Sequence, residues 1–177
     1  MDQVKLLALS GSLRAQSRNS ALLRAAAVVA PANISLTLYR ELSSLPPFNP
    51  DLDPQCIPAV LALSRVVGAA DGLLFACPEY AHGVPGALKN ALDWLVAGEE
   101  FVHKPIALWN ASPRAAHAQA ALAEIVSTMS GRIVSDACIA VPLLGTTFDD
   151  AQIAAVPEWR SLMRKALGRF AKAIRVA

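Results

Sequence analysis

The residues with the clearest capacity for chemistry form a polar stretch between an apolar run and a helix-like run. Residues 10–19 read SGSLRAQSRN and supply three hydroxyls, two guanidinium groups and side-chain amides, next to the N–H groups of a helix start. This set of donors suits a phosphate monoester, because charged donors and helix N-termini both favour an anion. The stretch holds a single glycine and matches neither the dinucleotide fingerprint nor the P-loop pattern.

The magnitude of each interaction decides which groups of this stretch must bind the anion. A helix terminus contributes only about 0.3–1 kcal/mol to binding an anion, so hydroxyls and guanidinium groups must supply most of the affinity. A simpler interpretation stays open, in which Ser17 or Asn19 only caps the following helix.

A second candidate stretch, PEYAHGVPGALKNALDWL, spans residues 78–95 and follows another apolar run. Tyr80 can offer an aromatic wall and a hydroxyl, or can be an ordinary exposed loop residue. Gly83 and Gly86 permit a close approach of the backbone to a flat ligand, or serve the turn alone. Further along, the spacing favours a structural role for Lys89 and Asp93, either as an i,i+4 pair or in an interface contact.

The elements that must position these stretches alternate between strand and helix. We expect strands at residues 4–10, 34–39, 71–77, 104–110 and 133–141, the last with a polar interruption at Ser135 and Asp136. We expect helices at residues 19–30, 57–69, 85–97, 115–130 and 149–176, the last broken at Pro157.

This alternation predicts an α/β fold with a mostly parallel sheet covered by helices on both faces. Strands that are apolar throughout fit a sheet buried on both sides. Five strands favour the flavodoxin-like order 2-1-3-4-5, a three-layer sandwich formed by a single domain over residues 1–177. Such sheets bind ligands where the strand order reverses, so the loops after Ser10, Cys77 and Asn110 should form the site.

Composition excludes several classes of protein. Hydrophobic residues make up 54% and charged residues 17%, which indicates a globular domain. The net charge of +2 without a basic run argues against nucleic-acid binding, and no apolar run is long enough to span a membrane. Three widely spaced cysteines predict free thiols, and the N-terminus lacks the pattern of a signal peptide, so we expect a cytoplasmic protein.

The two polar stretches together resemble the NAD(P)H-dependent FMN reductases, a family that includes quinone, chromate and azo reductases. The resemblance lies in GSLR-x-x-S-x-N at residues 11–19 and in PEY followed by PG-x-LKNALDW at residues 78–94. It implies FMN as cofactor, with the phosphate held by four side chains of the first stretch: Ser12, Arg14, Ser17 and Asn19.

The resemblance also implies which part of the cofactor the second and third loops would contact. The ribityl chain and ring edge would lie along four residues, largely through backbone groups: Pro78, Glu79, Tyr80 and Ala81. The family usually carries Asn where this chain has Ala81, so Ala81 offers a backbone contact at most. In the third loop, which departs from the family by lacking glycines, Ser112 can still reach the flavin.

The activity implied is hydride transfer from NADPH or NADH to bound FMN, followed by two-electron transfer to a small-molecule acceptor such as a quinone, chromate, an azo compound or free flavin. The protein supplies position and exclusion of water, so no catalytic side chain is predicted. The resemblance further implies a homodimer or homotetramer with the helix at 85–97 near the interface, and Trp94 is expected in the core or in that contact.

Other residues near these loops are assigned no chemistry. His82 is expected to be a loop residue, Cys77 a buried core thiol, and no spacing of histidines and carboxylates predicts a metal site. Two other functions stay open: a flavodoxin-like FMN electron carrier without a substrate of its own, and a non-enzymatic, flavin-free regulatory domain. Carriers of that kind are usually acidic with a Thr-rich phosphate loop, unlike this slightly basic chain.

Overall fold

The sheet has the strand order expected from the alternation of elements. The computed structural model describes residues 3–176. Its strands run β2-β1-β3-β4-β5, every pairing is parallel, and a sixth short strand also pairs with β4. The strand bounds are β1 Val4–Ser10, β2 Ile34–Tyr39, β3 Gly72–Ala76, β4 Pro105–Asn110, β5 Arg132–Ile133 and β6 Ile139–Ala140.

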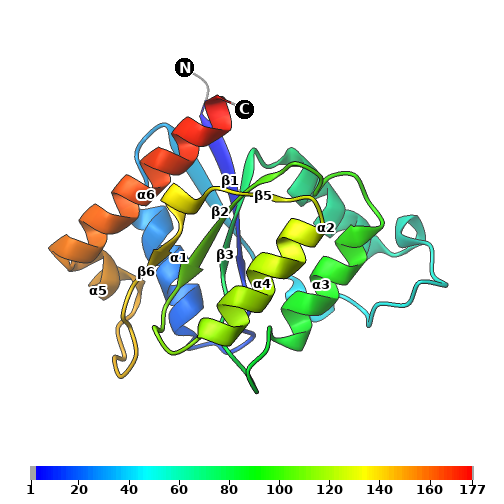
Figure 1. Cartoon of the computed structure of the whole chain (residues 1–177), viewed down its shortest axis with the longest axis horizontal. Helices are drawn as coiled ribbons and strands as arrows, with labels where there is room; N and C mark the ends of the chain where they lie inside the picture. Colours follow the sequence, from blue (N-terminus) through cyan, green and yellow to red (C-terminus); the bar gives the residue numbers. More distant parts are fainter. Residues whose placement is uncertain (1–2, 177) are drawn as a thin grey trace.

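The helices cover both faces of this sheet (Figure 1). Their bounds are α1 Arg18–Val29, α2 Pro58–Ala69, α3 Gly86–Val96, α4 Ala116–Thr128, α5 Asp150–Ala155 and α6 Pro157–Arg175. The predicted break at Pro157 is confirmed, because α5 ends two residues earlier and Pro157 opens α6, where a missing N–H costs least.

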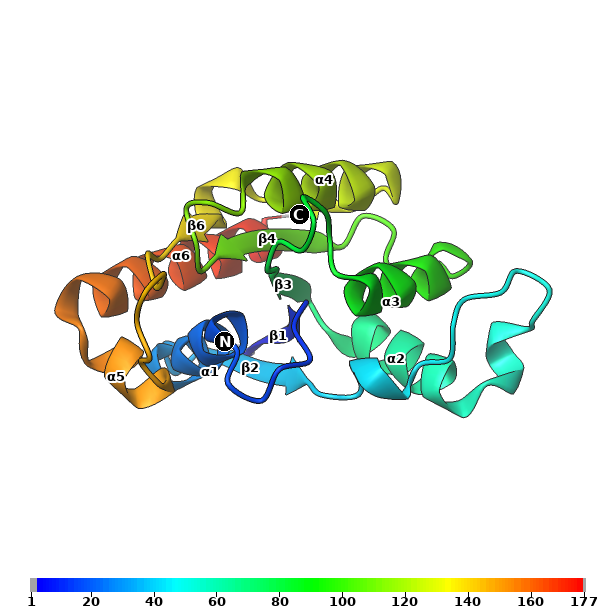
Figure 2. The same cartoon turned by 90° about the horizontal axis from the view of Figure 1, so that it is seen from below.

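Two apolar clusters, one on each face of the sheet, divide the helices into layers. Leu6 and Ala8 of β1 pack with α1, α5 and α6, whereas Leu7 and Leu9 pack with α2, α3 and α4. The alternation follows from the period of two along a strand. Figure 2 shows the two helical layers with the sheet between them. The predicted three-layer sandwich is therefore confirmed.

The last strand differs from the prediction of one strand over residues 133–141. It is split into β5 and β6 by a 3-10 turn at Ser135–Ala137. Serine and aspartate favour turns because their side chains compete for backbone groups. The turn is fixed to the sheet by the indole of Trp109, whose Nε1 donates to the carbonyl oxygen of Ala137 at 2.9 Å.

The helix α3 and the proline-rich segment before α2 are joined by a small polar network. Trp94 is buried, and its Nε1 donates to the Pro46 carbonyl oxygen at 2.8 Å. Asn90 Nδ2 donates to the same carbonyl at 2.9 Å, and its Oδ1 accepts from Phe48 N at 2.7 Å. Of the two roles expected for Lys89 and Asp93, the ion pair is present on the outer face of α3.

Candidate functional site

A cavity of about 820 Å³ opens at the carboxyl ends of the strands. That volume lies in the range of small-molecule and cofactor sites. Its walls come from the loops after β1, β3 and β4, from the first turns of α1, and from residues 144–149 after β6. In Figure 1 these loops lie along the lower edge of the molecule.

All but one of the residues predicted for the site line this cavity. Those that line it are Ser12, Arg14, Ser17, Asn19, Pro78, Glu79, Tyr80 and Ser112. Ala81 does not line it. Ala81 is an exposed residue of the turn that follows Tyr80 and has a left-handed backbone, with φ of 49°.

The loop after β1 keeps its hydroxyl hydrogens available for a ligand. Ser17 is the N-cap of α1, and its Oγ accepts from Ser20 N at 3.2 Å. Ser12 Oγ accepts from Arg14 N at 3.3 Å. A hydroxyl that accepts one hydrogen bond retains one O–H to donate. Capping and ligand binding by Ser17 are thus compatible, although the sequence presented them as alternatives.

Two further groups of this loop have unused hydrogen-bonding capacity. The Asn19 Oδ1 is buried beside the cavity and has no hydrogen-bond partner within residues 3–176. A buried polar atom left unpaired costs about 1–3 kcal/mol, and rotation of the amide presents a donor in its place. The exposed guanidinium of Arg14 makes no ion pair with any carboxylate of that same range.

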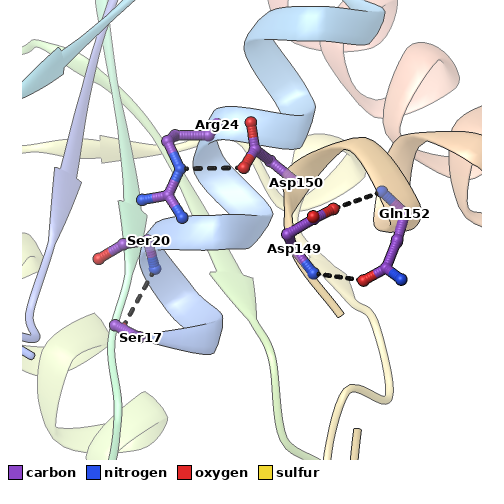
Figure 3. A network of polar contacts seen from close by, with 6 residues as sticks. All are labelled: Ser17, Ser20, Arg24, Asp149, Asp150 and Gln152. Carbon is purple, nitrogen blue, oxygen red and sulfur yellow. Dashed lines mark hydrogen bonds and ion pairs between the residues drawn. The ribbon is translucent and has the colours of Figure 1, made fainter. Parts of the chain in front are cut away.

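A fourth wall of the cavity, residues 144–149, was missed by the sequence analysis. Arg18 Nε donates to the Thr146 carbonyl oxygen at 2.9 Å. Figure 3 shows the second attachment, in which Arg24 Nε lies 3.3 Å from Asp150 Oδ1. Asp149 caps α5 reciprocally with Gln152, at 2.8 and 3.0 Å. The D-x-x-Q spacing of that cap is a readable signal for the helix start. By contrast, no signal in the sequence predicts that this wall is attached to α1, more than 120 residues earlier in the chain.

The loop after β3 is attached to the start of α4. Glu79 Oε2 accepts from Ala118 N at 2.9 Å, so one oxygen of this carboxylate serves the helix N-terminus rather than a ligand. Tyr80 and Gly83 exchange backbone hydrogen bonds of 3.2 and 3.0 Å across the turn. His82, within that turn, stacks on His117 with ring centroids 4.4 Å apart.

The loop after β4 is built on a buried asparagine. Asn110 Oδ1 accepts from Ser112 N at 2.8 Å, and Ser112 Oγ accepts from Arg114 N at 3.3 Å. This loop turns back over the strand end and places Ser112 at the cavity. As for Ser12 and Ser17, the Ser112 hydroxyl keeps a hydrogen to donate.

The thiol of Cys77, which follows β3, has low reactivity. Cys77 is buried, as predicted, and its Sγ lies 3.2 Å from the Pro78 carbonyl oxygen. Burial, with the negative charge of Glu79 as a second cause, raises the pKa of Cys77 from 9.0 to about 12. The thiol is therefore neutral near pH 7 and is a poor nucleophile.

A second, smaller cavity of about 370 Å³ adjoins the first. Apolar atoms of Leu13, Pro85 and Ala87 line it, and Arg14 and Tyr80 line both cavities. These two residues are thus common to the linings of both cavities.

Within residues 3–176 no cluster of three or more histidine, cysteine, aspartate or glutamate side chains is arranged to hold a metal ion. In the same range, no helix combines the length and the apolar content needed to cross a bilayer. The groups at the large cavity, namely hydroxyls with a hydrogen to donate, an Asn19 amide that can present a donor by rotation and a guanidinium just before the N-terminus of α1, fit a phosphate monoester such as that of FMN.

The fold and this site define a class of flavodoxin-like proteins that bind their ligand at the carboxyl edge of the sheet. Residues 4–143 match the family model of the NADPH-dependent FMN reductases. The chain belongs to that family.

Individual relatives agree with this assignment. The chain is 42% identical over 114 residues to an NAD(P)H-dependent FMN reductase of Pseudomonas aeruginosa and 31% identical over 115 residues to a quinone reductase of Escherichia coli K12. In both cases the match covers 63% of this chain and 61% of the relative. The chain thus matches about three fifths of the length of these relatives.

A solved structure supports the fold along nearly the whole chain. FerB, a flavoenzyme NAD(P)H:(acceptor) oxidoreductase from Paracoccus denitrificans, superposes with a TM-score of 0.80 at 24% identity and covers 98% of both chains.

Proposed function

We propose that this protein is an FMN-containing oxidoreductase that uses NADPH or NADH to reduce a small-molecule acceptor. Membership of the FMN reductase family supports the reaction class, and relatives named quinone reductase and azoreductase support the acceptor class. The single observation that carries the proposal is the convergence of the two family motifs on one cavity of about 820 Å³.

The residues of the first loop would hold the phosphate of FMN. Ser12 and Ser17 each have a hydroxyl hydrogen to donate, and Arg14 supplies a charge that no carboxylate of residues 3–176 neutralises. The unpaired amide of Asn19 would gain a partner. Charge-assisted hydrogen bonds are roughly twice as strong as neutral ones, which favours a phosphorylated ligand over a neutral flavin.

The other loops would flank the flavin ring. Pro78, Glu79 and Tyr80 lie along one wall and Ser112 along another. Ala81 would act only through the backbone of the turn. FMN, when bound, supplies the chemistry of accepting hydride and passing on electrons. The protein would bind and orient it, and the aromatic ring of Tyr80 would shield one side of it from water.

The acceptor would be a quinone, chromate, an azo compound or free flavin, and we propose a quinone as the first to test. Purified protein reconstituted with FMN should oxidise no more than one equivalent of NADPH per bound flavin under anaerobic conditions, and should turn over continuously when a quinone is added. Steady-state turnover supports the enzyme. An FMN-loaded protein without turnover would be an electron carrier, and a protein that takes up no FMN would be a flavin-free domain.

We further propose a cytoplasmic homodimer or homotetramer. The three cysteines are all free, which suits a reducing compartment. Phe48, whose ring packs on Trp94 of α3, and Val96 at the end of α3 are 38% and 62% exposed, and such apolar surface would suit a subunit contact. Light scattering on a sizing column tests the mass, and a monomer at micromolar concentration would contradict this part of the proposal.

A further inference from the structure

The turn after Tyr80 has a backbone that alanine does not favour. Ala81 and His82 have φ of 49° and 60°, in the left-handed region. Most residues with a Cβ avoid this region, although asparagine, aspartate and histidine enter it more often than the others. Alanine at position 81 has no such tolerance, so the hydrogen bonds across the turn and contacts from outside it must offset the unfavourable conformation.

Two consecutive residues in the first turn of α4 make those contacts. On one side of the turn, Glu79 Oε2 accepts from Ala118 N at 2.9 Å. On the other, the imidazole of His82 stacks on that of His117, with 4.4 Å between centroids and 14° between planes. All of these groups come from segments about 40 residues apart, so the turn depends on its docking to α4.

The docking of this turn on α4 also determines the position of Tyr80. Its backbone N and O both bond across the turn to Gly83, at 3.2 and 3.0 Å. Tyr80 also lines, with Arg14, both cavities. A change in the turn therefore moves the tyrosine that faces both the cofactor cavity and the apolar cavity beside it.

We propose that Glu79, His82 and His117 are positioning residues that hold the Ala81–His82 turn in its left-handed form and so fix Tyr80 against the bound cofactor. None of the three needs to touch the cofactor through its side chain. The claim that Tyr80 is fixed against FMN rests on the proposed function. The claim that α4 holds the turn is independent of that function.

The test compares His117→Ala with His117→Phe, which keeps a flat ring over His82, and with the double variant His117→Ala/Ala81→Gly. His117 is exposed, so all three should fold. Amide hydrogen exchange at Gly83 in FMN-free protein reports the turn, and FMN titration of apoprotein reports the site. The midpoint potential of the bound flavin reports the position of the loop at the ring.

His117→Ala should raise both the Gly83 exchange rate and the Kd for FMN by roughly 2- to 10-fold, the range expected for loss of one stacked ring pair. It should also shift the flavin potential. His117→Phe should stay near the wild-type values. Glycine at position 81 adopts the left-handed backbone without a steric cost, so the double variant should recover most of the loss.

Wild-type exchange and affinity in His117→Ala would overturn the proposal. A loss equally large in His117→Phe, or one that glycine at position 81 does not recover, would overturn it as well. Should none of the proteins bind FMN, the proposed function fails, while the exchange rates in FMN-free protein still decide whether α4 holds the turn.

Discussion

Ser17 shows how one side chain can serve both the fold and a ligand. Its oxygen caps α1 by accepting from Ser20 N, and the same hydroxyl, in the lining of the large cavity, keeps a hydrogen to donate. The chemistry of residues 10–19 could be predicted from the sequence because the donors are adjacent in the chain. The sequence left open whether Ser17 caps or binds, since the two roles use different atoms of one hydroxyl.

Substituting Ser17 separates these roles. Ser17→Ala should lower the free energy of unfolding by about 1 kcal/mol, whereas Ser17→Gly should cost only a few tenths, because glycine is tolerated at the N-cap. Both lose the donated hydrogen bond and should weaken FMN binding by roughly 10-fold or more. Urea denaturation and fluorescence titration measure the two effects. An FMN affinity that follows stability, and differs between the two variants, would contradict the dual role.

The raised pKa of Cys77 predicts how the stability of the protein changes at alkaline pH. Because its pKa is raised from 9.0 to about 12 by burial, the folded protein keeps this thiol protonated where the unfolded chain loses the proton. The unfolded state then binds fewer protons, so stability is complete below pH 9 and falls as the pH rises towards 12. One thiol contributes a slope of at most about 1.4 kcal/mol per pH unit.

Stability curves at several pH values check this slope. Cys77→Ala should flatten it between pH 9 and 11, a window set by the same shift. The pKa of Cys138 is also raised by burial, so part of the slope should remain. Cys56→Ala, at an exposed position, is the matched control for the loss of a thiol. An identical slope in Cys77→Ala and wild type would refute the assignment.

At the scale of elements, the first residue of β3 lies under the last helix. A Cβ on Gly72 would come within 2.8 Å of Ile174 Cδ1 and 2.9 Å of Phe170 Cζ, both on α6. A side chain at this position would therefore force the ends of Ile174 and Phe170 to shift. Gly168, inside α6, would meet nothing within 4 Å.

Alanine substitutions at Gly72 and Gly168 should therefore change the free energy of unfolding in opposite directions. Gly72→Ala should destabilise the protein by about 1–3 kcal/mol through overpacking. Gly168→Ala should stabilise it by about 0.5–1 kcal/mol, because glycine in an exposed helix interior is unfavourable. Chemical denaturation of both variants measures the pair, and destabilisation by Gly168→Ala would show that the surface of α6 is covered.

Most element bounds could be predicted because apolar runs and prolines mark them locally. The strands at Val4–Ser10 and Ile34–Tyr39 and the restart at Pro157 agree with the periodicity. The polar pair Ser135 and Asp136 marks the place where the last strand divides, but the bond from Trp109 to Ala137 across 28 residues, which holds the turn on the sheet, has no local signal. The same holds for the wall at residues 144–149, which Arg18 and Arg24 attach to α1.

At the scale of the whole molecule, the strand order brings loops far apart in the chain to one edge. The sequence predicted this edge because parallel strands end on the same side of a sheet. It could not predict that the left-handed turn at Ala81 and His82 docks on α4, because that contact depends on how two loops pack. The family motifs therefore located the site, and the structure supplied the contacts that hold it.

The most direct test compares FMN with riboflavin as ligands of the apoprotein. If the loop after β1 holds a phosphate monoester, FMN should bind at least roughly 100-fold more tightly than riboflavin, because several charge-assisted bonds are lost together. In Arg14→Ala this ratio should fall by roughly 10-fold, whereas Arg65→Ala, on α2 and outside both cavities, should preserve it. Equal affinities for FMN and riboflavin in the wild-type protein would contradict the account.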